Sequence, residues 1–273
     1  NYFEPMGDLS IWLIIIYAST GLTILVEPTF YQRIFAAKSY KNVRNALIAG
    51  IFIWGAYDWI ITILAMAAKV GTLQGIIDPS VQPDAALLTI MVTALPAGVL
   101  GLFLAGVLST EMSTLDSYCL VAGGNVAYDV YQPMTKKEVS DKQLINMTRY
   151  GIALSWVLGF AMALAFDQML GLWVFMASIL ISSVTIPIIF GLYIKRFRKP
   201  MAGFLSAGLG LFSTIILNVL VMTKGVFVGE EETYVLQLGQ WEIMQEYIMY
   251  FTIPISLIGF FIGLLIDKGK YYE

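Results

Sequence analysis

The chain has 273 residues, of which 58% are hydrophobic and only 13% charged, whereas a soluble domain usually has about 25% charged residues. The formal net charge of −3 is too small to indicate a class of partner. The single cysteine, Cys119, excludes an internal disulfide and a cysteine metal cage, and the lack of histidine excludes histidine relays and histidine metal sites.

Seven stretches are apolar and long enough to cross a bilayer, which takes about 20 residues. In chain order they are about 8–36, 43–68, 96–128, 143–165, 169–194, 200–222 and 243–266. A shorter helix over about 84–93 is expected outside the membrane, stopped near Pro96. The first residues, from Asn1, have the character of a loop that enters a helix, and we expect a fragment of a longer protein. The predicted fold class is therefore an all-α integral membrane protein with about seven transmembrane helices.

The basic residues predict how these spans are oriented. Fourteen of the 16 fall in connections on one side: Arg33, Lys38, Lys41, Arg44, Lys136, Lys137, Lys142, Arg149, Lys195, Arg196, Arg198, Lys199, Lys268 and Lys270. Only Lys69 and Lys224 lie on the other side. By the positive-inside rule the basic side is cytoplasmic. In the plasma membrane the N-terminus is therefore expected outside the cell and the C-terminus in the cytoplasm. The outer side carries an acidic group: Glu230, Glu231 and Glu232, with Glu242 and Glu246 nearby.

The span over 96–128 holds more polar side chains than hydrocarbon tolerates. Seven lie within nine residues: Ser109, Thr110, Glu111, Ser113, Thr114, Asp116 and Ser117. At about 100° per residue, one face collects Gly106, Ser109, Ser113, Asp116 and Ser117, flanked by Thr110 and Thr114. Glu111 falls nearly opposite Ser109. Membrane hydroxyls often serve only helix packing. Five hydroxyls and two acids this close favour a cation site, since hard cations such as sodium prefer oxygen ligands.

The span over 8–36 is interrupted by Thr20, Gly21 and Thr23, and Glu27-Pro28 follows. Pro28 removes a backbone donor and crowds the preceding turn. One interpretation is a broken helix whose backbone groups bind substrate or ions. The other is a proline kink near the membrane surface.

Two further polar features lie inside predicted spans. Asp58 is either a proton or cation site or the partner of a buried polar group. In the span over 169–194 a polar patch precedes Pro187: Ser178, Ser182, Ser183 and Thr185. Taken alone, that patch indicates helix packing. Gly123-Gly124 indicates close packing at most.

Three motifs carry a resemblance to a known family. They are FYQRIFAAKSYKNVRNA at 30–46, PDAALLTIMVTALPAGVLGLFLAGVLSTEMSTLDSYCLVAGGNVAYDVYQP at 83–133 and IPIIFGLYIKRFRKPMAGFLSAGLG at 186–210. The chain resembles the sodium/solute symporter family, which has the LeuT-like fold, and the motifs stand in the family's order.

The resemblance implies that inward sodium flow drives uptake of a small organic solute: a sugar, amino acid, vitamin or organic acid. Na⁺ is the coupling ion and no other cofactor is implied. Residues 1–195 would form the second inverted repeat, core helices six to ten, and 196–273 two peripheral spans and a cytoplasmic tail. The first inverted repeat would then come from the full-length chain or from a partner chain.

Residue by residue, the resemblance assigns the sodium ligands to the span over 96–128. Ser113 and Thr114 match two hydroxyls that ligate sodium, and Thr110 matches a position that contributes a backbone carbonyl. Asp116 and Asp58 match no carboxylate expected in the family. They are candidates for ion or proton coupling, and they leave open whether sodium or protons are coupled.

The resemblance also places Thr20, Thr23 and Ile24 toward the substrate. The expected partners are the solute and the lipid bilayer, and no nucleic acid is expected. The sequence contains neither a nucleophile–base pair nor a metal-ligand cluster, so it does not indicate an enzyme. The alternative function is a symporter-like sensory membrane domain of a signalling protein.

Overall fold

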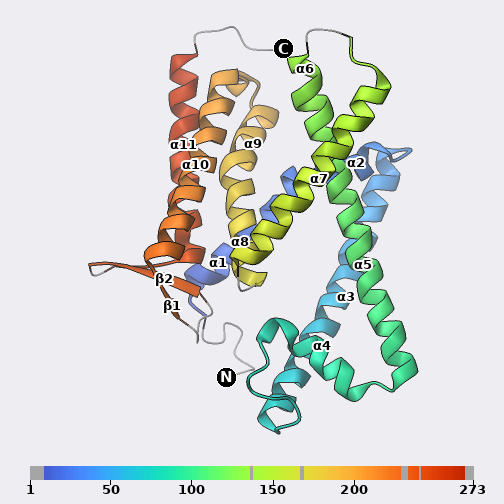
Figure 1. Cartoon of the computed structure of the whole chain (residues 1–273). Helices are drawn as coiled ribbons and strands as arrows, with labels where there is room; N and C mark the ends of the chain where they lie inside the picture. The colour runs from blue at the N-terminus through green and yellow to red at the C-terminus, as the bar shows by residue number, and fades with distance from the viewer. Residues whose placement is uncertain (1–8, 136–137, 167–168, 229–232, 240, 268–273) are drawn as a thin grey trace. The chain divides into compact units, whose positions relative to one another are not determined.

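The structure is a computed structural model, and it describes residues 9–135, 138–166, 169–228, 233–239 and 241–267 (Figure 1). Several residues of the sequence analysis lie outside this described part: the first eight residues, Lys136, Lys137, Glu230, Glu231, Glu232, Lys268 and Lys270. The chain divides into two compact units. One is formed by the residues up to Glu27 and those from Ala165 onward, and the other by Pro28–Leu164.

The described helices confirm a multi-pass membrane protein. Six helical segments are long and apolar enough to cross a membrane, and a seventh is obtained if the interrupted helix at 11–35 counts as one span. The six are Tyr40–Leu73, Ala97–Met134, Asp141–Ala165, Met169–Tyr193, Pro200–Lys224 and Gln245–Ile266. They coincide with six of the predicted apolar runs, because hydrocarbon selects long helices whose backbone groups bond internally.

The unit Pro28–Leu164 consists of long helices. Its elements are α2 (Pro28–Phe35), α3 (Tyr40–Leu73), α4 (Pro83–Ala94), α5 (Ala97–Gly124), a π-helical stretch η2 (Asn125–Tyr131), α6 (Gln132–Met134) and α7 (Asp141–Ala165). The Ser39 hydroxyl caps α3 by accepting from the Asn42 amide at 3.3 Å. α4 is the predicted short helix, with Pro83 in its first turn. Gly75, with φ +70°, lets the chain turn after α3.

α5 and α7 pack through two glycines. A Cβ atom at Gly123 would lie 2.5 Å from the Thr148 carbonyl oxygen, and one at Gly151 would lie 2.8 Å from Gly123 Cα. Real Cβ atoms essentially never come closer than 3.0 Å to such atoms, so only glycine fits at either position. The expected close packing at Gly123 is therefore confirmed, whereas Gly124 has open space among the described residues.

The other unit combines the start of the chain with its last helices. Its elements are α1 (Ile11–Thr20), the 3₁₀ stretch η1 (Gly21–Val26), α8 (Met169–Leu180), the π-helical stretch η3 (Ile181–Thr185), α9 (Ile186–Tyr193), η4 (Lys195–Phe197), α10 (Pro200–Lys224), η5 (Gln245–Tyr247) and α11 (Ile248–Ile266). Its three strands are β1 (Val226–Val228), β2 (Thr233–Leu238) and β3 (Trp241–Met244).

α10 and α11 run side by side in this unit (Figure 1). The buried residues of α10 recur every fourth position and are mostly small or polar: Ala202, Ser206, Gly210, Thr214 and Asn218. Ser206 Oγ lies 2.9 Å from Ser256 Oγ on α11. Cβ atoms at Gly259 and Gly263 would collide with the α10 backbone, at 2.8 Å and 2.4 Å. Small residues hold this pair together by allowing close backbone approach, as in other membrane helix pairs.

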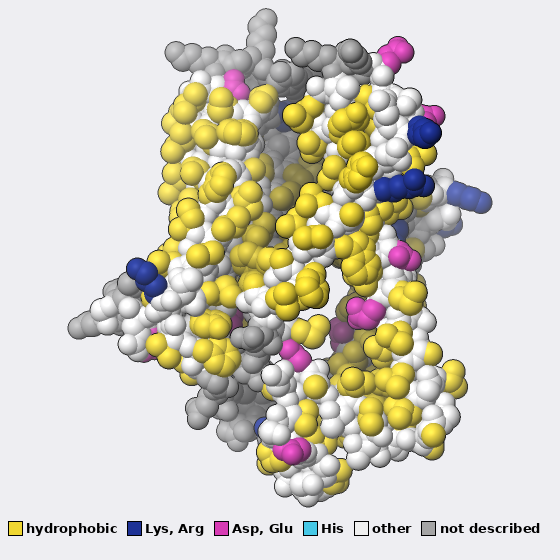
Figure 2. Space-filling model, viewed as in Figure 1, with side chains coloured by type: hydrophobic (Ala, Val, Ile, Leu, Met, Phe, Trp, Pro, Cys, Tyr) yellow, Lys and Arg dark blue, Asp and Glu magenta, His cyan; other side chains and the backbone are white. Residues whose placement is uncertain are grey.

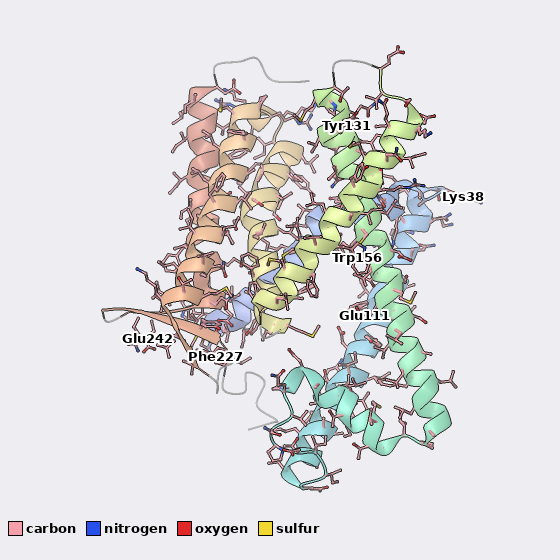
Figure 3. The ribbon with its side chains drawn as sticks, viewed as in Figure 1. Lys38, Glu111, Tyr131, Trp156, Phe227 and Glu242 are labelled. Carbon is pink, nitrogen blue, oxygen red and sulfur yellow. The ribbon has the colours of Figure 1, made fainter. Side chains whose placement is uncertain are left out.

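A three-stranded antiparallel sheet connects α10 to α11, where the sequence analysis expected only an acidic loop. The missed signal is the run of β-branched and aromatic residues in β1 and β2, which favours strands. Gly239, with φ +64°, lies in the turn between β2 and β3. Figure 3 shows Phe227 and Glu242 on this sheet. The ring of Phe227 packs on that of Tyr234 with centroids 5.2 Å apart.

Hydrophobic side chains cover much of the helix surface seen in Figure 2. The apolar windows of α3 and of the α5 span contain no buried residue, whereas that of the Met169–Tyr193 span is 44% buried. The Pro28–Leu164 unit therefore buries little of its long helices against itself, whereas the other unit has a defined interior.

Candidate functional site

The helix at the start of the chain is interrupted. After α1 the backbone continues as η1, becomes extended at Glu27 (φ −72°, ψ 111°) and resumes as α2 at Pro28. The span predicted over 8–36 is thus interrupted directly before Pro28, as the sequence indicated, and this position fits both a broken helix and a proline kink. The Thr20 hydroxyl donates to the Tyr17 carbonyl at 2.7 Å, and the Thr23 hydroxyl donates to the Thr20 carbonyl at 2.8 Å. Both hydroxyls thus satisfy their own backbone and keep lone pairs for another donor or a cation.

The three predicted substrate-lining residues differ in burial. Thr20 is buried, Thr23 is half-buried and Ile24 is exposed within its unit. η1 packs against η3 and α8 of the same unit. Two stretches with non-α hydrogen bonding therefore meet, and such stretches inside helices often mark functional sites.

The polar patch before Pro187 forms a buried contact among three helices. Ser182 is fully buried, and its Oγ lies 3.1 Å from Thr214 Oγ1 and 3.2 Å from Thr252 Oγ1. Gly210 lies so close that a Cβ there would come within 2.1 Å of the Ser182 carbonyl oxygen. The expectation that this patch serves packing is confirmed for Ser182.

The five hydroxyl residues of the predicted cation site lie near the middle of α5: Ser109, Thr110, Ser113 and Thr114 are exposed within their unit, and Ser117 is half-buried. Thr114 Oγ1 donates to the Thr110 carbonyl at 3.0 Å, and Thr110 Oγ1 donates to the Gly106 carbonyl at 3.0 Å. Ser113 Oγ has no hydrogen-bond partner among the described residues, while the Ser113 carbonyl accepts from Ser117 Oγ at 3.1 Å. Among the described residues Thr110, Ser113 and Thr114 are exposed, and their hydroxyls keep their acceptor capacity.

The candidate acids of the spans are exposed within the described part of the chain. Glu111 and Asp116 lie on α5 and Asp58 lies on α3. Figure 3 labels Glu111 midway along α5. The Asp58 carbonyl accepts from the Thr62 hydroxyl at 2.8 Å. Among the described residues, no three Asp, Glu or Cys side chains come together as a metal site would require.

Thr110, Ser113 and Thr114 lie within about one turn of α5, and their role as sodium ligands stays a prediction. Thr20, Thr23 and Ile24 belong to the other unit. The hydroxyl and carbonyl oxygens of Thr110, Ser113 and Thr114 are uncharged ligands, which suit a monovalent hard cation better than a tightly held divalent one.

Sequence reasoning missed a buried polar junction at η5. Glu246 is only 5% exposed, and its carboxylate accepts from the Thr233 hydroxyl of β2 at 2.7 Å. Gln245 is equally buried, and its amide donates to Asn218 Oδ1 on α10 at 3.2 Å. The signal that could have found this junction is Asn218, a lone amide in the apolar run of α10.

Comparison with known proteins gives one match. The model of the Sodium:solute symporter family matches residues 1–227, which is most of the chain. No curated protein and no solved structure matches.

Proposed function

The chain belongs to the sodium:solute symporter family, and from this premise we propose that it supplies core helices six to ten of a sodium-coupled symporter for a small organic solute. Residues 1–195 form the second inverted repeat of a LeuT-like core in this proposal. Residues 196–273 add two peripheral spans and the tail. The observation that carries the proposal is the family match together with the hydroxyl-rich turn of α5.

Sodium binds at Thr110, Ser113 and Thr114 in this proposal. Thr110 O and Thr114 Oγ1 lie 3.0 Å apart. One hard cation at about 2.3–2.6 Å from each oxygen, the range known for calcium, can bridge such a pair. Ser113 Oγ lies on the same turn of α5, on the face that Thr110 and Thr114 flank, and adds a third ligand in this proposal. The ion takes its remaining oxygens from other segments of the transporter.

Those other segments also cover the acids of the spans. A charge that faces lipid at mid-bilayer costs about 2.5–3.5 kcal/mol on insertion scales, so Asp58, Glu111 and Asp116 favour contact with protein or water. Each is exposed within the described part of this chain. We therefore assign the covering surface to the first repeat, supplied by the full-length chain or by a partner chain.

The solute binds beside Thr20, Thr23 and Ile24 in this proposal, where α1 changes into η1 ahead of the break at Glu27–Pro28. Interrupted spanning helices present backbone groups to substrates in transporters of this kind. The threonine hydroxyls suit hydroxyl, amide and carboxylate groups alike, which fits a sugar, amino acid, vitamin or organic acid.

Sodium and solute binding are coupled in this mechanism. Sodium at α5 stabilises the outward-open state, which raises the affinity for the solute, and the solute raises the affinity for sodium by the same factor. Closure and inward release follow by movement of one part of the core against the other. With the basic connections in the cytoplasm of a cell, the N-terminus of this chain faces outward in the plasma membrane.

The test is sodium-driven solute uptake by the complete transporter in proteoliposomes, first with a panel of sugars, amino acids, vitamins and organic acids. Replacing Ser113 and Thr114 by alanine should raise the half-saturating sodium concentration about tenfold or more, since a bond to a charged group is worth about 1.5–3 kcal/mol. Thr89→Ala together with Thr93→Ala on α4 is the matched control, because both hydroxyls also donate to a carbonyl one turn back and neither lies on α5. Unchanged sodium dependence in the double variant would refute the assignment.

The same vesicles distinguish sodium from protons. Uptake that is independent of sodium but driven by a pH gradient would indicate that Asp116 and Asp58 couple protons to transport. In that case Asp116→Asn should abolish the pH-driven component.

A further inference from the structure

The N-terminal end of α1 is hydrogen-bonded to η5 and α11 through residues far apart in sequence. Tyr250 donates its hydroxyl to the Trp12 carbonyl at 2.8 Å. Tyr247 Oη lies 3.1 Å from Ser10 Oγ, and Ser10 is the residue that caps α1. The same Ser10 oxygen accepts the Leu13 amide at 3.2 Å. Both tyrosines therefore act on the first turn of α1.

Ring contacts reinforce these hydrogen bonds. Trp12 and Tyr250 meet edge to face, with centroids 6.1 Å apart and planes at 85°. The rings of Tyr247 and Tyr250 lie 6.1 Å apart. Edge-to-face pairs add to simple area burial, so the indole and the two phenols form one aromatic group.

Tyr247 lies on η5 and Tyr250 on the first turn of α11, which follows η5 directly, and η5 is itself held by hydrogen bonds. η5 is held from β2 through Thr233 and Glu246 and from α10 through Asn218 and Gln245. Both η5 side chains are buried, and a buried amide or carboxylate resists movement because each lost hydrogen bond leaves an unpaired polar group. The connection between sheet and α11 is thus rigid enough to hold another helix.

α1, by contrast, has little packing of its own. Of the residues of α1, only Ile16 and Thr20 are buried, and these lie on one face, four residues apart. Elsewhere its side chains are exposed or half-buried. The hydrogen bonds at Ser10 and Trp12 therefore add to the packing of Ile16 and Thr20 in holding the helix in place.

We propose that Tyr247 and Tyr250 are positioning residues for the broken helix. They hold the first turn of α1 and so set the position of Thr20 at its other end and of Thr23 in the η1 stretch that follows. The peripheral helices then form the support of the α1–η1 helix rather than a mere addition to the core. The consequence for transport rests on the proposed function, but the anchoring itself does not.

The experiment measures hydrogen exchange of α1 in the complete transporter, purified in detergent. Replacing Tyr247 and Tyr250 by phenylalanine together should speed amide exchange in a peptide over 11–20. Each lost bond should contribute roughly a two- to tenfold increase, the factor for about 0.5–1.5 kcal/mol. Exchange over 202–221 of α10 should be unchanged, which excludes general unfolding. Tyr193→Phe is the matched control, because Tyr193 is 82% exposed.

Rescue at the cap separates positioning from general packing. Ser10→Ala should speed α1 exchange, and Ser10→Thr, which keeps the hydroxyl, should restore it. Unchanged exchange over 11–20 in the double tyrosine variant overturns the proposal. Unchanged sodium dependence in Ser113→Ala with Thr114→Ala overturns only the sodium site, so the two failures are distinguishable.

Discussion

Gly210 on α10 offers the sharpest test of how the interior of its unit is built. A Cβ at this position would lie 2.1 Å from the Ser182 carbonyl oxygen and 2.5 Å from the Ser182 carbonyl carbon. These are backbone atoms of η3, so no side chain can swing away. For Gly210→Ala, α10 and η3 must separate by about 1.3 Å, from 2.1 Å to 3.4 Å, to restore ordinary contact, which also stretches the contact from Ser182 to Thr214.

Two effects of opposite sign determine the magnitude. Alanine is favoured over glycine in a helix by about 0.8–1.0 kcal/mol. Overpacking a close contact costs about 1–3 kcal/mol. Gly208→Ala on the same helix isolates the first effect, because the described residues leave open space around that position. The two variants should therefore differ in stability by about 1–3 kcal/mol, with Gly210→Ala the less stable.

The assay is thermal unfolding of the complete transporter in detergent, with both variants and the parent protein side by side. Gly208→Ala should melt at or slightly above the parent, and Gly210→Ala several degrees below Gly208→Ala, at about 2–4 °C per kcal/mol. Hydrogen exchange over 178–186 should rise in Gly210→Ala alone. Equal melting temperatures for the two alanine variants would refute the close approach of α10 to η3.

Two further predictions concern the Pro28–Leu164 unit. Gly151→Ala should lower the melting temperature, since its Cβ would meet Gly123 Cα at 2.8 Å, whereas Gly159→Ala, with open space among the described residues, should not; equal effects would contradict the α5–α7 contact. In the connection after α3, the Ser80 amide and hydroxyl donate to Asp78 at 2.8 Å and 2.7 Å, and hold the pKa of Asp78 below its ordinary 3.8. Because this pKa is lowered by folding, the turn should be fully stabilised above about pH 3.8 and loosen as the pH falls through the lowered value. Carboxyl NMR titration of Asp78, with Ser80→Ala raising the midpoint toward 3.8, checks this.

The sequence alone was sufficient for the membrane-spanning helices and for the break near Pro28. Both are local properties. An apolar run of about 20 residues satisfies the bilayer wherever it lies, and a proline cannot donate a backbone hydrogen bond in any surroundings. The spacing of Thr110, Ser113 and Thr114 within about one turn of α5 also follows from helix periodicity alone.

The roles of chemically similar groups, by contrast, were decided by tertiary structure. Ser182 and Ser113 are both serines in apolar helices, yet Ser182 is buried between α10 and α11, while Ser113 is exposed and keeps its hydroxyl available. Glu246, expected among the acids of the outer side, is buried with Thr233. Burial depends on which helices approach one another, and that approach is set by glycines such as Gly210 and Gly259, whose partners lie far away in the chain. Spacing along one helix predicts which side chains share a face, but only the packed structure determines whether that face is buried.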